Sequence, residues 1–210
     1  MALSEQAQVA LGVGCGNSGV GVEIAKALNM TKDTGNVGAA NGATVTATEY
    51  TDASGTFHKT VLTLAATPLT LRDTEQGKGV KVYDFPEGFI TVLGGHMEIA
   101  VTTTSVINGT LNASKTLSIG VGSTTQANGT LATTEQDIVN VGSTTSSATI
   151  NVAGATGTCV NTTPKGFDGS ATPVDAYLNI GVPTGTDIDA DATVTVTGSI
   201  TILWAYLGDA

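Results

Sequence analysis

The sequence has few charged residues, and positively charged ones are the scarcest. Only 12% of its 210 residues are charged, and 8 Lys and Arg stand against 18 Asp and Glu, which gives a formal net charge of −10. Nucleic-acid binding depends on cationic side chains that neutralise phosphates, so we expect no nucleic-acid partner. The low charge does not indicate disorder, because the mean hydropathy is +0.19 and disordered chains combine low hydropathy with high charge.

Long apolar runs and closely spaced cysteines are also missing. No stretch approaches the ~18 apolar residues that span a bilayer. The start of the chain, residues 1–8, lacks the basic and apolar regions of a secretory signal. Cys15 and Cys159 lie far apart, and in a cytosolic chain they are most simply reduced thiols. We therefore expect a protein that is made in the cytoplasm and has no membrane partner.

Histidine is too sparse for the common catalytic and metal sites. His58 and His96 are the only two histidines, and neither stands in a paired-ligand spacing. The nucleophile elbow G-x-S-x-G and the phosphate-binding P-loop are absent as well. We predict a protein that is not an enzyme and has no catalytic residues, no cofactor and no metal.

Two motifs resemble ligand sites but lack the surrounding pattern that such sites need. Residues 14–19 match G-x-G-x-x-G, yet polar residues precede them and strands follow, so we interpret them as part of a flexible arm. Asp187, Asp189 and Asp191 resemble the opening of a calcium loop, but the required glycine and glutamate do not follow. We interpret these aspartates as a solvated loop, and whether they hold a weak cation is left open.

Alternation of apolar and polar residues dominates the rest of the chain. From Thr193 to Trp204, apolar residues alternate with threonine and serine, which is the period of a half-buried β-strand with Trp204 on its core side. Similar runs recur from about Ala43 onward, separated by Asn-Gly and Ser-Gly turns. We predict an all-β antiparallel β-sandwich, and among sandwiches a jelly roll, over residues 43–210. The expected strands are Thr44–Tyr50, Phe57–Leu64, Leu69–Leu71, Gly79–Phe85, Phe89–Leu93, Met97–Thr103, Thr116–Val121, Asp137–Val141, Ala148–Val152, Ala176–Val182 and Thr193–Trp204.

The first 42 residues differ in composition and are predicted to form a glycine-rich arm. Within Gly19–Met30, apolar residues recur at helical spacing, so this stretch could form a short amphipathic helix. Such a helix has little stability alone. It would gain order either by packing on a partner or by capping one end of its own sandwich, and both alternatives stay open. The residues expected at a partner interface are Leu11, Val13, Ile24, Leu28 and Tyr206.

Two stretches of the sequence resemble a known family. The end of the chain, Asp187–Asp209, with its run Ala-Thr-Val-Thr-Val-Thr-Gly-Ser-Ile-Thr-Ile-Leu-Trp-Ala-Tyr-Leu, resembles the ending of capsid cement, or decoration, proteins of tailed bacteriophages. Leu117–Thr125 and Gly129–Ile138 are similar to the same group, so the resemblance covers about the C-terminal half. It implies a jelly-roll-like sandwich that binds major capsid protein on the outside of an icosahedral shell. No catalytic residues are implied.

The expected function is therefore that of a virion structural protein that stabilises a capsid from its exterior. It would also contact itself, as a dimer or a trimer, and the sequence does not choose between the two. The alternative is a head-fibre or tail module that recognises a host surface. A non-enzymatic protein is expected in either case.

Overall fold

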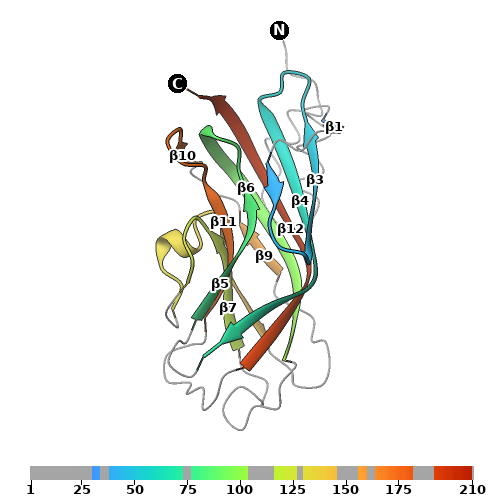
Figure 1. The fold of residues 1–210 in the computed structure, drawn as a ribbon, viewed down its shortest axis with the longest axis vertical. Coiled ribbons are helices and arrows are strands. Elements are labelled where there is room, and N and C mark those ends of the chain that lie inside the picture. Colours follow the sequence, from blue (N-terminus) through green and yellow to red (C-terminus); the bar gives the residue numbers. More distant parts are fainter. Residues whose placement is uncertain are drawn as a thin grey trace.

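The structure is a computed structural model, and it describes residues 30–33, 38–72, 77–103, 116–126, 130–145, 156–159, 164–181 and 192–209. These residues form two β-sheets that enclose one hydrophobic core (Figure 1). Every strand pairing among them is antiparallel. The single helical element of the described part is a 3-10 turn, η2 (Thr133–Glu135). The prediction of an all-β antiparallel architecture is confirmed.

The two sheets differ in the length of their strands. The long sheet contains, in spatial order, β1 (Thr31–Lys32), β3 (Val45–Thr51), β4 (Phe57–Leu71), β12 (Ala192–Gly208), β6 (Gly88–Thr103) and β10 (Lys165–Gly169), with β9 (Thr156–Cys159) also paired to β6. The short sheet contains β2 (Ala39–Ala40), β5 (Gly77–Asp84), β11 (Asp175–Gly181), β7 (Thr116–Gly122) and β8 (Val139–Thr145). β1 and β2 lie within the predicted arm. β1 pairs with β3 of the long sheet, and β2 pairs with β5 of the short sheet.

Three long strands form the centre of the long sheet. β4, β12 and β6 contain 15, 17 and 16 residues, so each spans about 50 Å at the usual rise per residue. β12 lies between the other two and pairs with both along nearly its whole length. Side chains in β12 alternate between the two faces of the sheet. The two-residue period of its sequence therefore determines which residues face the core along the whole length of the long sheet.

A bulge interrupts the register between β12 and β4 near the middle of both strands. Val196 pairs with Thr67, whereas Gly198 pairs with Leu64, so β4 has an extra residue at this point. Ala66 takes a positive φ of 59° to accommodate it, and Gly198 has a φ of 131°. Bulges of this kind bend a strand and increase its twist, which lets such long strands wrap around the core.

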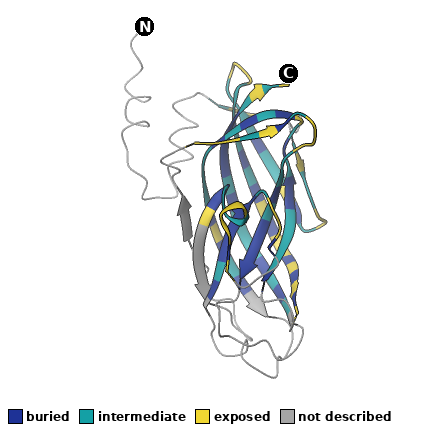
Figure 2. Cartoon of the chain, turned by 90° about the vertical axis from the view of Figure 1, so that its left-hand side faces the viewer, coloured by how far each residue is buried: buried dark blue, intermediate teal, exposed yellow. Residues whose placement is uncertain are grey.

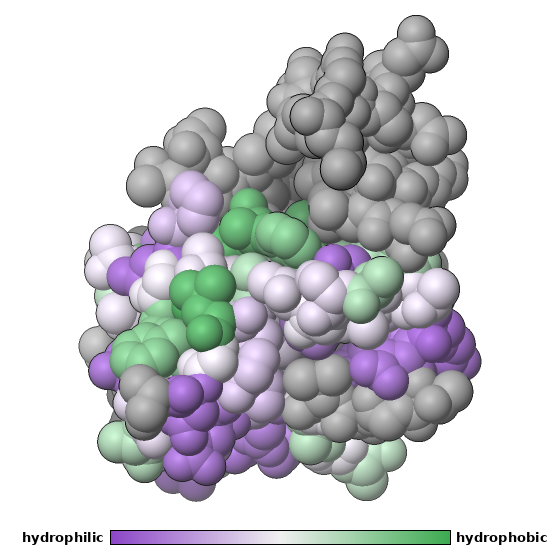
Figure 3. Space-filling view, turned by 90° about the horizontal axis from the view of Figure 1, so that it is seen from above, coloured by the Kyte–Doolittle hydropathy of each residue, from purple (hydrophilic) through white to green (hydrophobic). Residues whose placement is uncertain are grey.

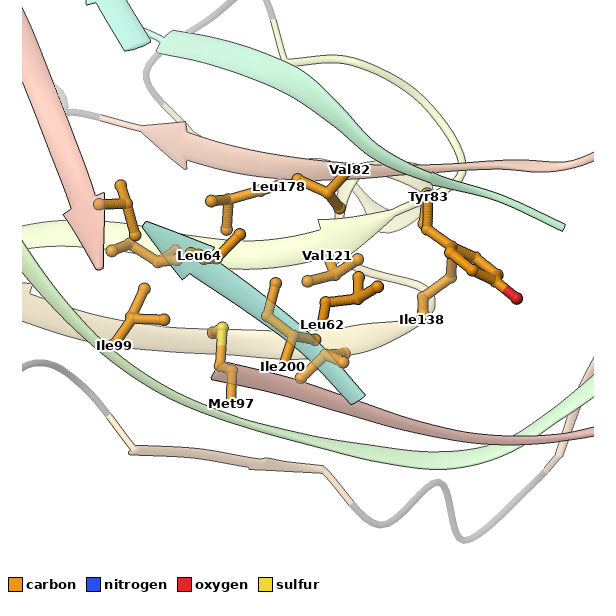
Figure 4. Packing of buried hydrophobic residues seen from close by; sticks show 14 of the residues in the cluster. Leu62, Leu64, Val82, Tyr83, Met97, Ile99, Val121, Ile138, Leu178 and Ile200 are labelled. Atoms are coloured by element: carbon orange, nitrogen blue, oxygen red, sulfur yellow. The ribbon is translucent and has the colours of Figure 1, made fainter. Parts of the chain in front are cut away.

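The core is built from side chains of both sheets. Its largest fully buried members include Trp204 from the long sheet and Tyr83 from the short one, together with Phe85 just after β5. Figure 4 shows aliphatic side chains from the two sheets pointing toward one another, among them Leu62 and Leu178. Trp204 is fully buried, which confirms its predicted place in the core.

One buried amide fastens the loops of the short sheet. The Asn179 side chain, on β11, is fully buried. Its Oδ1 accepts a hydrogen bond from the Gln126 backbone N–H at 2.8 Å, and its Nδ2 donates to the carbonyls of Thr124 at 2.9 Å and Glu135 at 2.8 Å. A buried amide that is satisfied on both ends fixes the segments it joins. Asn179 thereby holds the turn after β7 and η2 against the sheet.

The structure merges two pairs of predicted strands and shifts the limits of another, since the strand predicted at Asp137–Val141 is β8, Val139–Thr145. The predicted gap between Phe57–Leu64 and Leu69–Leu71 lies inside β4, and the gap between Phe89–Leu93 and Met97–Thr103 lies inside β6. β9 and β10 were not predicted at all. The predicted strand Ala148–Val152 and the helix expected within Gly19–Met30 lie outside the described residues.

Candidate interaction face

The outer face of the long sheet is the surface turned away from the short sheet. Its residues follow from the register, because side chains alternate between the two faces along each strand. On β12, Ile200, Ile202 and Trp204 belong to the core, so the residues between them point outward. Figure 2 shows the long strands carrying buried and partly buried residues in alternation.

Over the middle of the outer face the side chains are mostly hydroxyls. β12 contributes Thr197, Ser199 and Thr201, and all three are partly exposed. On the neighbouring strands, Thr63 pairs with both Ser199 and Thr46, whereas Val61, which pairs with both Thr201 and Thr48, is apolar. The members of this hydroxyl face are Thr46, Thr48, Thr63, Thr70, Thr197, Ser199 and Thr201.

The hydroxyl face carries little charge. Glu98, which pairs with Ser199, is an exposed carboxylate on the β6 side of this face. His96 pairs with Thr201 and is partly exposed. Hydroxyls both donate and accept hydrogen bonds, so they can lie against water or against another protein at a smaller desolvation cost than charged groups.

Toward the end of β12 the same outer face becomes apolar. Leu203 and Ala205 occupy the next two outward positions after Thr201; both are buried, but neither belongs to the core cluster between the sheets. Phe57 pairs with Ala205, and Phe89 pairs with Gly208. The members of this terminal apolar patch are Phe57, Phe89, Leu203, Ala205 and Leu207. Figure 3 looks onto this end of the sandwich and shows apolar side chains at the surface among polar ones.

Leu207 is the most exposed member of the terminal apolar patch. It is 62% exposed, and among the described residues no other large apolar side chain is classed as exposed. The register between β12 and β6 shifts between Tyr206 and Gly208, which makes Leu207 an extra residue in β12. A bulge re-aims the side chain of the inserted residue, and here the inserted side chain points into solvent.

A lysine flanks the terminal apolar patch on the β4 side. Lys59 pairs with Leu203 on one side and with Tyr50 on the other. Its ammonium lies 5.0 Å from the centroid of the Tyr50 ring, a cation–π distance. Burial lowers the pKa of Lys59, because an ammonium is less well solvated among apolar neighbours.

Beneath the terminal apolar patch, an aromatic cluster supports the end of β12. The His58 ring stacks on Trp204 with centroids 4.3 Å apart, and Phe85 meets Trp204 edge-on at 5.2 Å. Trp204 Nε1 donates to Thr60 Oγ1 at 2.9 Å. His58 contacts Thr51 Oγ1 and the Gly55 carbonyl at 3.0 Å each. Burial lowers the pKa of His58, since the charged ring would lose solvation there.

A buried carboxylate joins the two sheets next to this cluster. Glu49 on β3 is only 2% exposed. It accepts a hydrogen bond from the hydroxyl of Tyr83 on β5 and another from the Gly38 backbone N–H at 3.3 Å. Burial together with this hydrogen bond raises the pKa of Tyr83 far above its usual value. This pair could not be predicted from the sequence, because a glutamate inside an alternating strand is usually exposed.

Tyr206 was predicted to lie at a surface or a subunit contact. The structure places it half-buried, packed against the core. Its hydroxyl donates to the Glu87 carbonyl at 3.0 Å, which fastens the turn between β5 and β6 to the end of β12. Tyr206 is next in sequence to Leu207, so it borders the terminal apolar patch. The other predicted interface residues, Leu11, Val13, Ile24 and Leu28, lie outside the described residues.

Other candidate ligand sites find no support among the described residues. The part of the chain that the structure describes contains no group of three metal-binding side chains. Residues 14–19 and the aspartates at 187, 189 and 191 are not described. None of the described residues forms a helix that is long and apolar enough to cross a membrane.

Comparisons with known proteins identify no relative of this chain. No family model matches the chain, and neither the curated proteins nor the solved structures contain a significant match. The outer face of the long sheet is therefore the candidate functional site of the described residues.

Proposed function

We propose that the protein is a non-enzymatic virion structural protein that binds the outer surface of a phage capsid and stabilises it, with the hydroxyl face as its contact surface. The observation that carries the proposal is the composition of this face, where outward hydroxyls from β3, β4 and β12 meet across three paired strands. The resemblance of the C-terminal half to capsid decoration proteins supports it.

The architecture suits a protein that must keep one shape at many equivalent sites. Three strands of about 50 Å form one continuous sheet, and the aromatic cluster and Glu49 join it to the short sheet. A rigid, preorganised surface loses little conformational entropy on binding. Each contact then adds a modest free energy, and many copies together stabilise the shell because they bind only its assembled form.

The finer fold assignment is part of the proposal. Two antiparallel sheets with crossing connections are compatible with a jelly roll, and the resemblance implies one. Contact between copies, as a dimer or a trimer, would let neighbouring sites on the shell reinforce one another. The place of action would be the exterior of the virion.

The test is cosedimentation of the purified protein with emptied, expanded capsids. We expect saturation at a copy number that matches the repeat of the shell subunits, together with a higher melting temperature of the shell. Thr63→Glu places a charge in the centre of the hydroxyl face and should weaken binding by about tenfold or more, since 1.4 kcal/mol corresponds to a factor of ten. Thr172→Glu, at an exposed turn between β10 and β11, is the matched control.

The same experiment separates this proposal from the alternative of a head-fibre or tail module. Binding of only a few copies per particle, or none, would contradict the decoration function. A fibre or tail module would instead bind host cells or isolated host glycans as a purified protein. If Thr63→Glu and Thr172→Glu bind the capsid equally well, the protein binds capsids but the hydroxyl face is not its contact surface.

A further inference from the structure

A short segment around β2 fastens the chain to both sheets. β2 pairs with the end of β5 in the short sheet. Just before β2, the Gly38 N–H donates to the Glu49 carboxylate in the long sheet at 3.3 Å. A Cβ on Gly38 would collide with the Tyr83 hydroxyl and ring, so the segment lies close against the buried pair that joins the sheets. We call residues 38–41 the β2 strap.

Asn41, the last residue of the β2 strap, is held at two points. Its backbone N–H donates to the Val82 carbonyl at 3.0 Å. Its side-chain Nδ2 donates to Asp84 Oδ2 at 3.2 Å. A hydrogen bond to a charged acceptor is stronger than one between neutral groups, so the amide of Asn41 is an anchor of the strap on β5.

The carboxylate that receives this amide already faces another one. Asp175 lies directly opposite Asp84 across the pairing of β5 and β11. Lys81 contacts both carboxylates, with its Nζ 2.7 Å from Asp84 Oδ1 and 3.4 Å from Asp175 Oδ1. Like charges directly opposite each other destabilise a sheet. The Lys81 ammonium and the Asn41 amide both donate to Asp84 and so offset this repulsion.

Glycine follows Asn41, and the space around this glycine is open. Gly42 has a φ of 94°, and a Cβ there would meet only Val45 Cγ2 at 3.9 Å. Both residues lie in the turn between β2 and β3, where Asn41 is partly exposed and Gly42 is exposed. The Gly42 nitrogen carries no bulky neighbour that would keep it from the Asn41 side chain, and water reaches the site.

We propose that Asn41 is a deamidation site and that its conversion releases the β2 strap. The Gly42 nitrogen attacks Asn41 Cγ, and the new N–C bond closes a succinimide ring. The Cγ–Nδ2 bond breaks, and the displaced nitrogen leaves as ammonia with the Gly42 amide proton. A water molecule then opens the ring at either carbonyl carbon and yields aspartate or isoaspartate. Both products carry a carboxylate, which only accepts hydrogen bonds, so the bond to Asp84 is replaced by repulsion.

Peptide mapping tests the modification. The purified protein is kept in mildly alkaline buffer and digested with trypsin, which cuts after Lys32 and Lys59 and gives one peptide around Asn41. Mass spectrometry of its fragments should show the mass gain of an amide-to-acid conversion at Asn41. Asn140 is exposed but precedes valine, and Asn179 is buried, so both should keep their amides.

The same map contains the controls for the chemistry. Asn41→Gln keeps an amide on a longer side chain, which disfavours ring closure, and should stay unmodified. Asn108 and Asn128 also precede glycine. An Asn41 that keeps its amide while these two lose theirs would overturn the proposal, and so would intact amides at all three positions.

Hydrogen exchange tests the release of the β2 strap. Asn41→Asp reproduces one product and should speed amide exchange in residues 38–41 by about tenfold or more, because the strap loses an anchor and gains a repulsive charge. Asn140→Asp adds the same charge on β8 and should leave this exchange unchanged. Aged protein compared with fresh protein gives the same readout without a substitution. Unchanged exchange in either Asn41→Asp or the aged protein would overturn the proposal. Neither measurement involves a capsid, so failure here is distinct from failure of the decoration function.

Discussion

Replacing Gly198 by alanine should destabilise the protein strongly, because this glycine has both an unusual backbone and no free space. Its φ of 131° is one that side chains other than glycine rarely adopt, and such strain costs about 1–3 kcal/mol. A Cβ at this position would lie 2.7 Å from Ile99 Cα and closer still to the Glu98 carbonyl oxygen. Both atoms are backbone of β6, the neighbouring strand.

The expected cost is the sum of these two effects less a small gain. Overpacking that shifts backbone costs about 1–3 kcal/mol, while alanine restricts the unfolded chain and returns about 0.4–1 kcal/mol. We therefore expect Gly198→Ala to lower the free energy of unfolding by about 2–5 kcal/mol. With an m-value of about 1–3 kcal/mol/M, the urea midpoint should fall by about 1 M or more.

The measurement is urea unfolding followed by fluorescence of Trp204, the single tryptophan, and by far-UV circular dichroism. Gly55→Ala is the matched control, since Gly55 also has a positive φ, 72°, but a Cβ there would meet nothing within 4 Å. The control should cost about 1 kcal/mol from the backbone alone. A loss below about 0.5 kcal/mol for Gly198→Ala, or one equal to that of Gly55→Ala, would refute the role given to the close approach of β6.

Three further predictions concern the buried amide, the bulge and the buried imidazole. Asn179→Asp replaces an amide that donates to two carbonyls by a carboxylate facing them, so we expect a loss of about 3 kcal/mol or more in thermal or urea unfolding; unchanged stability would show that the Asn179 contacts are dispensable. Ala66→Gly relieves a φ of 59° at an exposed position and should stabilise the protein by about 0.5–1 kcal/mol. This value is the backbone strain that is removed minus the entropy that glycine adds to the unfolded chain. A loss of stability would show that Ala66 is not strained. Burial lowers the pKa of His58, so the unfolded state binds the proton more readily, and the free energy of unfolding should fall as the pH drops below about 6.5. This fall should be smaller in His58→Gln. Identical pH profiles of the two proteins would exclude His58 as its source.

The alternation in β12 was sufficient to predict the architecture but not the limits of the long strands. The predicted break between Leu64 and Leu69 contains Pro68, yet β4 continues through it to Leu71, and β3 pairs with β4 only up to Leu64. Among the described residues Pro68 therefore lies at a sheet edge, where the missing N–H of proline is tolerated. The bulge at Ala66 depends on the neighbouring strand, so the local sequence does not reveal it.

The glycines of β6 misled the prediction for a related reason. Gly94 and Gly95 fall in the predicted gap between two strands, whereas they lie within the single strand β6. A Cβ at Gly95 would come within 2.6 Å of Val139 Cγ2 on the short sheet, so the glycine is required by close packing between the sheets rather than by a turn. Contacts between residues so distant in sequence cannot be read from composition.

The outer face could be predicted only in part. The hydroxyl side of β12 follows directly from the period of Thr193 to Trp204. The terminal apolar patch does not, because Leu203, Ala205 and Leu207 continue an apolar run whose other members are core residues. Only the register, and the bulge at Leu207, shows that these three point outward.

The central position of β12 also determines how the protein would respond to mechanical load. The hydrogen bonds of an antiparallel sheet lie across the strands, and β12 makes them with β4 and β6 along nearly its whole length. A force applied along the strand through Gly208 would load both rows in shear at once, whereas β10, an edge strand of five residues, could be peeled away one bond at a time. A cargo or anchor fused after the end of β12 would therefore be attached to the most mechanically resistant strand of the sandwich.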